Sequence, residues 1–85
     1  MRVWGKKKTE DIIIADITFD AADFSAALEA VCSHFDLSKP IVCAKHFDEI
    51  KTFSRTVFYQ DDFVESISFE TLEIEIIGGR KKEQN

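Results

Sequence analysis

The stretch DIIIADITFDAADFSAALEAVCSHFD, residues 11–36, decides the fold, because its apolar pattern changes period partway along. In residues 11–19 apolar side chains alternate along one face, which is the period of a β-strand. In residues 23–36 they recur every three or four positions, which is the spacing of one helix face. The two faces consist of Ile13, Ala15, Ile17 and Phe19 in the strand, and of Phe24, Ala27, Leu28, Val31, Cys32 and Phe35 in the helix.

Both ends of the predicted strand carry further information. Ile12 and Ile14 put apolar side chains on its second face, so we expect its start to be covered on both sides. Asp20 is expected to cap the helix, and Asp23 to lie in the first helical turn, where a carboxylate favours the helix dipole.

The residues before this stretch complete a hairpin. Residues 2–7 predict an extended segment anchored by Trp4, and residues 8–10 predict the turn that joins it to the next strand. Two strands so close in sequence are expected to pair antiparallel.

A second helix is predicted after Pro40, the only proline, which ends the first helix. Residues 45–53 fit a helix with Phe47, Ile50 and Phe53 on its inner side. Residues 41–43 fit either a short buried strand or the opening of this helix.

The remainder predicts one connection and one strand. Residues 54–62 are expected to be a connection, with room for a short strand at residues 56–59. Residues 71–77 predict a final strand with one buried apolar face and one solvated acidic face. The apolar face consists of Leu72, Ile74 and Ile76, and the acidic face of Glu73 and Glu75, with Glu65 and Glu70 upstream.

These elements predict an α+β fold. We expect a small antiparallel sheet, built from the N-terminal hairpin and the C-terminal strand, with two helices packed on one face. Residues 1–79 are expected to form a single domain, and residues 80–85 a polar, flexible tail.

Composition narrows the function classes. The 85 residues include 11 basic and 16 acidic residues, a net charge of −5, which argues against nucleic acid as a partner because phosphate contacts require Lys and Arg. Two cysteines and no long apolar run favour a cytoplasmic protein with reduced thiols and no membrane segment. Neither a glycine-rich phosphate loop nor a hydrolase motif is present, so we predict no catalytic residues and no cofactor.

Four residues have the types of a zinc site, namely Cys32, His34, Cys43 and His46. Residues two apart on a helix point in different directions, so Cys32 and His34 converge only if the helix ends early. The other interpretation is that both cysteines are small core residues and both histidines lie at the surface or its boundary. We favour this second interpretation and predict no metal.

The connection at residues 53–63 is the candidate interaction surface, because it combines an arginine with aromatic and acidic residues. Its candidate residues are Arg55, Tyr59, Asp61 and Asp62. The alternative, which we favour, is structural: Phe53, Phe58 and Phe63 are buried anchors, and Arg55 pairs with Asp61 or Asp62 to order the segment.

Two basic runs flank the predicted sheet, at residues 6–8 and residues 80–82. If they met in space they would form a basic patch on an acidic protein, although two solubilising ends are the expected result.

Four short motifs resemble a family of small uncharacterised bacterial proteins, mostly from Firmicutes. They are P-I-V-x-x-K-H at residues 40–46, F-x-R-T-x-F at residues 53–58, D-x-F-V-E at residues 61–65 and L-E-I-E-I at residues 72–76. The resemblance implies a bacterial, cytosolic origin. It implies no activity and no binding residues.

The sequence therefore predicts a non-enzymatic protein-interaction module. Its expected partner is a second copy of itself, as a homo-oligomer, or another protein. A thin core with exposed sheet edges gains stability when it pairs with another surface. The alternative is a small-ligand or metal-binding protein that uses the Cys and His residues or the Arg55 segment.

Overall fold

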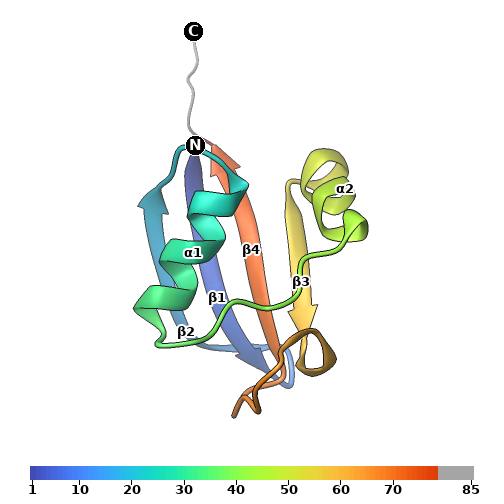
Figure 1. Ribbon diagram of the computed structural model, residues 1–85. Coiled ribbons are helices and arrows are strands. Elements are labelled where there is room, and N and C mark those ends of the chain that lie inside the picture. Colours follow the sequence, from blue (N-terminus) through green and yellow to red (C-terminus); the bar gives the residue numbers. More distant parts are fainter. Residues whose placement is uncertain (79–85) are drawn as a thin grey trace, which may run out of the picture.

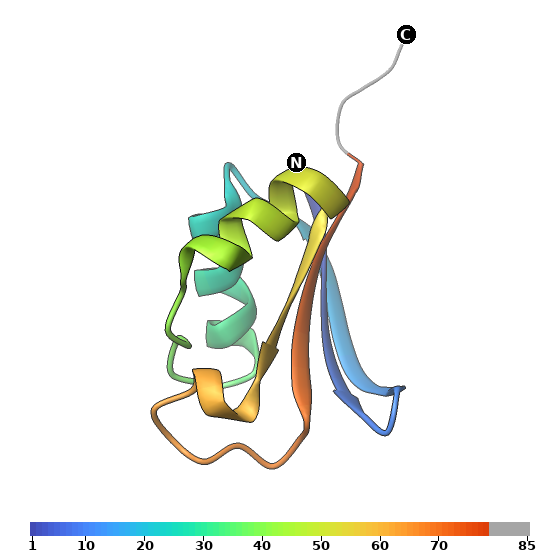
Figure 2. The ribbon, with the colours of Figure 1, turned by 90° about the vertical axis from the view of Figure 1, so that its right-hand side faces the viewer.

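The computed structural model describes residues 1–78 and contains one antiparallel sheet with two helices on one face (Figures 1 and 2). The strand order is β2-β1-β4-β3, and neighbouring strands run antiparallel. The elements are β1 (Arg2–Thr9), β2 (Ile12–Asp20), α1 (Phe24–His34), α2 (Ala44–Phe53), β3 (Arg55–Tyr59), the 3₁₀ helix η1 (Gln60–Asp62) and β4 (Thr71–Gly78). The predicted α+β class is confirmed. The predicted tail at residues 80–85 lies outside the described residues.

The hairpin of β1 and β2 turns at Glu10 and Asp11, one residue later than predicted. Both residues have a positive φ, 54° and 64°. A two-residue hairpin loop favours this left-handed backbone because it matches the twist of the two strands. The turn is therefore set by hairpin geometry, although neither residue is glycine.

The core lies between the sheet and α1, and its closest approach is at Gly5 in β1. A Cβ at Gly5 would lie 2.6 Å from Val31 Cγ2, so only glycine lets α1 sit this close to the sheet. The fully or nearly fully buried apolar residues are Val3, Phe24, Ala27, Leu28, Val31, Cys32, Phe58, Phe63, Phe69, Leu72 and Ile74. The predicted apolar faces of α1 and β4 supply most of this core.

The cap of α1 differs from the prediction. The N-cap is Asp23, whose Oδ1 accepts a hydrogen bond of 2.8 Å from the Ala26 backbone N–H. Asp20 instead ends β2 and pairs with Arg2 at 3.4 Å. The prediction of Asp20 as the cap was wrong because β2 extends one residue further than expected, through Asp20, and the helix begins only at Phe24.

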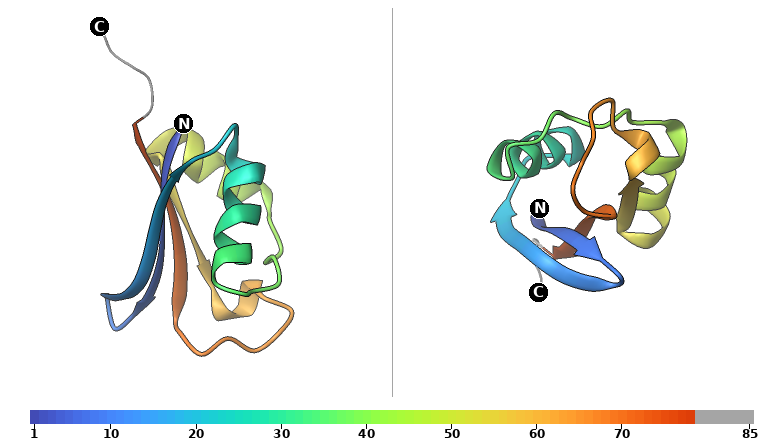
Figure 3. Two further views of the ribbon diagram at one scale, coloured as in Figure 1. Left: turned by 90° about the vertical axis from the view of Figure 1, so that its left-hand side faces the viewer. Right: turned by 90° about the horizontal axis from the view of Figure 1, so that it is seen from below.

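The start of β2 is exposed, so the prediction that it is covered on both faces is wrong. Ile12 is 63% exposed and Ile14 is 54% exposed. β2 is an edge strand, and the hairpin tip curls away from the helix layer (Figures 2 and 3). No described element covers this end of the hairpin.

The predicted inner face of α2 is also wrong in part. His46 is fully buried, whereas Phe47 and Phe53 are 50% and 67% exposed. Ile50 is half-buried against the core, as expected. The helix is rotated so that its histidine contacts β3: the His46 ring stacks on Phe58 with centroids 4.3 Å apart.

Residues 41–43 have no regular structure, so both alternatives for them, a short buried strand and the opening of the helix, are wrong. Cys43 is the N-cap of α2, in an extended conformation. The short strand predicted within residues 54–62 is β3, and it begins directly after Ser54, whose left-handed φ of 61° ends α2. This abrupt reversal lays α2 beside β3.

Candidate functional site

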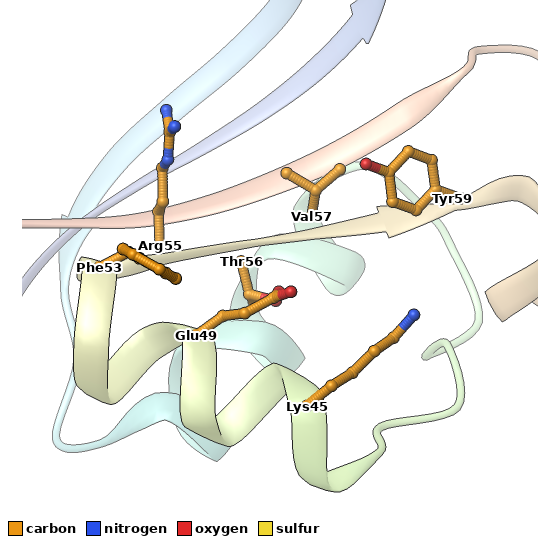
Figure 4. Close-up of a pocket in the computed structure, with 7 residues that line it drawn as sticks. All are labelled: Lys45, Glu49, Phe53, Arg55, Thr56, Val57 and Tyr59. Carbon is orange, nitrogen blue, oxygen red and sulfur yellow. The ribbon is translucent and has the colours of Figure 1, made fainter.

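A groove of about 250 Å³ runs along the outer edge of β3, between that strand and α2 (Figure 4). β3 is the last strand in the sheet order, so its outer edge has no neighbour among residues 1–78. The groove is lined by Lys45, Glu49, Phe53, Arg55, Thr56, Val57 and Tyr59.

The backbone of β3 alternates between its neighbour and this open edge. The Ser54 carbonyl accepts a hydrogen bond of 2.7 Å from the Ile76 N–H, so hydrogen bonds to β4 continue at every second residue. The backbone groups of Thr56 and Phe58 therefore point to β4. Those of Arg55, Val57 and Tyr59 point into the groove.

One of these outward donors is already used. The Tyr59 N–H donates to Asp62 Oδ2 at 2.9 Å, because η1 folds the chain back over the end of the strand. The open part of the edge is therefore short and centred on Val57, and Asp62 closes it at the Tyr59 end.

The groove has two unlike walls (Figure 4). Arg55, Val57 and Tyr59 point away from the helix layer on one side, since alternate residues of a strand share a face. Lys45, Glu49 and Phe53 line the other side at intervals of four residues, which is one stripe of α2.

The charged side chains of the groove differ in how strongly neighbouring residues bind them. The Thr56 hydroxyl donates to Glu49 Oε1, which holds this carboxylate against the strand. The Arg55 side chain is 62% exposed and lies 3.8 Å from Glu73 Oε2, a long contact. Lys45 is exposed at the Tyr59 end (Figure 4). The groove therefore offers a cation near each end.

The candidate residues named from sequence divide between this groove and its end. Arg55 and Tyr59 line it, and Tyr59 is 56% exposed. Asp62 caps the strand, and Asp61 is exposed in η1. Arg55 contacts Glu73 and neither Asp61 nor Asp62, so the structural alternative has the wrong partner for Arg55.

That alternative is right for two of its three phenylalanines. Phe58 is fully buried and Phe63 is 7% exposed, but Phe53 is 67% exposed. An exposed aromatic beside an open strand edge is typical of an interaction surface. Sequence periodicity missed this because it placed Phe53 on the core side of α2.

His46 is the polar residue that sequence reasoning placed wrongly at the surface. Its Nδ1 accepts a hydrogen bond of 2.9 Å from the Cys43 N–H, so the proton of the neutral ring lies on Nε2. Within residues 1–78, Nε2 has no hydrogen-bond partner and lies 3.8 Å from Asp62 Oδ2. His46 thus links α2 to β3 through Phe58 and to η1 through Asp62.

The residues proposed for zinc do not converge. Cys32 is buried in the core, where burial raises the pKa of its thiol to about 11, although Lys39 opposes this shift. Cys43 is exposed, so the prediction that it is a core residue is wrong. Among the described residues, no three His, Cys, Asp or Glu side chains are grouped to hold a metal ion.

The face of the sheet opposite the helices carries an ion-pair cluster, in place of the predicted acidic face. Lys6 Nζ lies 3.2 Å from Glu73 Oε2 and 2.7 Å from Glu75 Oε1, and Lys8 Nζ lies 3.2 Å from Glu73 Oε1. Lys6 and Glu73 are 5% and 4% exposed. Each acid of β4 is therefore neutralised by β1.

The basic run at residues 6–8 is neither part of a basic patch nor the solubilising end that was expected, because its ammonium groups have partners in the fold. Lys6 and Lys8 are bound to carboxylates, and the Lys7 ammonium lies 5.1–5.2 Å from the ring centres of Phe35 and Phe69. The second basic run, at residues 80–82, lies outside the described residues.

Between residues 1 and 78, neither helix has the length and apolar character needed to cross a membrane.

Comparisons of the chain with models of protein families, with curated proteins and with solved structures gave no match.

Proposed function

We propose that the protein is a non-enzymatic interaction module that adds an extended segment of a partner chain to the open edge of β3. The observation that carries this proposal is the groove along that edge, which combines outward backbone groups at Val57 with two side-chain walls. Strand addition of this kind takes affinity from main-chain hydrogen bonds and specificity from the side chains that flank the edge.

The flanking side chains suit an extended segment. Successive residues of an added strand point to opposite sides, so they would alternate between the Arg55–Val57–Tyr59 wall and the α2 wall. Phe53 and Tyr59 offer exposed aromatic surface, and Arg55 and Lys45 offer cations. Aromatic residues and arginine are enriched at the centres of protein interfaces.

We also propose that the protein acts in a bacterial cytosol. The resemblance of residues 40–76 to a bacterial family suggests a bacterial cytosol, and the two cysteines are free thiols, one of them exposed.

Val57→Pro is the variant that tests the proposal. Proline removes the outward N–H of Val57 and leaves the hydrogen bonds from β3 to β4 in place. A matched control exists on the opposite edge. The Ala21 N–H donates to the Met1 carbonyl at 2.9 Å, so in β2 the backbone groups of Thr18 also point outward. Thr18→Pro changes that edge alone.

The probe is a displayed library of random linear peptides, selected on the natural protein and resynthesised for fluorescence anisotropy. We expect the selected peptides to lose about tenfold in affinity for Val57→Pro, because the hydrogen bond donated by the Val57 N–H is lost and the proline ring occupies its place at the edge. Thr18→Pro should bind as the natural protein does. Peptides that depend on Thr18, or a selection on monomeric protein that yields no binder, would contradict the proposal.

A further inference from the structure

We infer that the segment added to β3 is the β3 strand of a second copy of this chain, in a closed antiparallel dimer. This inference rests on the proposed function and names its partner. The two-fold axis would pass beside Val57, and the two sheets would join into one continuous sheet.

The residues of β3 are self-complementary in this register. With Val57 opposite the partner's Val57, Arg55 lies opposite the partner's Tyr59, and Tyr59 opposite the partner's Arg55. All of these side chains share the face away from the helices (Figure 4). An arginine beside an aromatic ring across two strands is a favourable pair, and here it occurs twice by symmetry.

The charges along the strand also favour an antiparallel partner. Arg55 begins β3, whereas Asp61 and Asp62 follow its other end. Antiparallel pairing brings the basic end of each strand to the acidic end of its partner. On the helix side, the same operation carries the exposed Phe53 of one copy toward the Lys45 end of the partner's groove (Figure 4).

The backbone permits this register without breaking an existing bond. The N–H and C=O of Val57 point outward, so the two Val57 residues can exchange a pair of hydrogen bonds. The Tyr59 N–H stays bound to Asp62, which limits the new pairing to the centre of the strand.

The other edge of the sheet is less suited to self-pairing. Residues 10–20 include four acidic residues and no basic residue, so two copies of β2 would oppose like charges; the acids are Glu10, Asp11, Asp16 and Asp20. The β1–β2 pair is also irregular between Lys7 and Lys8, and a bulge of this kind blunts an edge. Pairing β2 with a second copy's β3 would leave free edges at both ends and grow without closing.

Sedimentation velocity over low to several hundred micromolar protein tests the inference. We expect the natural protein and Thr18→Pro to form dimers as concentration rises, and Val57→Pro to remain monomeric with an unchanged far-UV spectrum. Species that keep growing beyond the dimer, or a dimer lost in Thr18→Pro and kept in Val57→Pro, would overturn it.

Disulfide trapping tests the register. In a Cys43→Ser background, oxidised Val57→Cys should form a covalent dimer, because directly opposite residues lie about 5.5 Å apart at Cα, within disulfide range. Arg55→Cys alone should not cross-link, but mixing it with Tyr59→Cys should give the mixed dimer. Efficient self-linking of Arg55→Cys would overturn the register.

The outcomes separate the inference from the function on which it rests. A natural protein that stays monomeric but binds selected peptides through Val57 overturns the dimer and supports strand addition. A protein that neither dimerises nor binds peptides overturns both.

Discussion

The two faces of the sheet are both buried at their centres, but by different means. On the helix side, Val3 and Ile74 are fully buried under α1 among apolar side chains. On the opposite side, Lys6 and Glu73 are almost as inaccessible, although no described helix covers them. The Trp4 ring lies 3.8 Å from the Lys6 ammonium and donates its Nε1–H to Asp16 at 2.7 Å. The burial of the apolar face therefore depends on the shape complementarity of its side chains, and the burial of the charged face depends on the pairing of opposite charges.

The largest expected effect is on the apolar face, where the close packing of Gly5 against α1 can be disrupted. Gly5→Ala should lower the free energy of unfolding by about 3 kcal/mol, because the new Cβ meets Val31 on a helix that cannot easily move. Urea denaturation measures the loss. Adding Val31→Ala should restore part of it, and an unchanged urea midpoint for Gly5→Ala would refute the close approach of α1.

On the charged face, removing one member of an ion pair should destabilise the protein more than removing both members. Lys6→Met should cost about 2 kcal/mol, because Glu73 stays buried and only Lys8 and the distant Arg55 remain near it. The double variant Lys6→Met/Glu73→Met should recover much of this loss, since it leaves no unpaired charge at these two positions. Equal destabilisation of the single and double variants would contradict the pairing.

The smallest effect is a dependence on pH that only the charged face should show. Burial raises the pKa of Glu73, but the hydrogen bonds and charges of Lys6 and Lys8 outweigh burial and leave it below its usual value. A lowered folded pKa gives stability that is present above the unfolded pKa of about 4.3 and is lost as pH falls through the folded value.

Glu73→Gln checks this sign. The stability advantage of the natural protein over Glu73→Gln should shrink as pH falls from about 5 to about 3, because protonation then removes the charge of Glu73, which glutamine lacks at every pH. Thermal melts across this range measure the difference. An advantage that is constant or grows in acid would show that Glu73 is not held ionised by its lysines.

Sequence pattern was sufficient where one local period decided the structure. The face of α1 and the apolar face of β4 were predictable, because a helix or strand with one apolar stripe has one way to bury it. The same reasoning failed for α2, whose phenylalanines suggested the wrong face. His46 is buried there because its Nδ1 accepts a hydrogen bond from the Cys43 N–H and its ring stacks on Phe58. Neither contact is visible in the periodicity of the sequence.

The candidate site was predictable only as a region. Arg55 and Tyr59 lie in the groove, as their residue types indicated, but the groove itself depends on two facts of topology. β3 is an edge strand, and Ser54 turns the chain back so that α2 lies beside it. The partners of Lys6 were equally hidden, since Glu73 lies 67 residues away along the chain.

The central position of β1 has a consequence for the newly made chain. Among the described elements, β1 is synthesised first, whereas its second neighbour, β4, is the last to leave the ribosome. Until then β1 can pair only with β2, and Lys6 has neither of its carboxylate partners, because both lie in β4. Topologies that join distant segments in this way fold slowly. The nascent hairpin, with its exposed isoleucines, is therefore the species that most needs protection from aggregation.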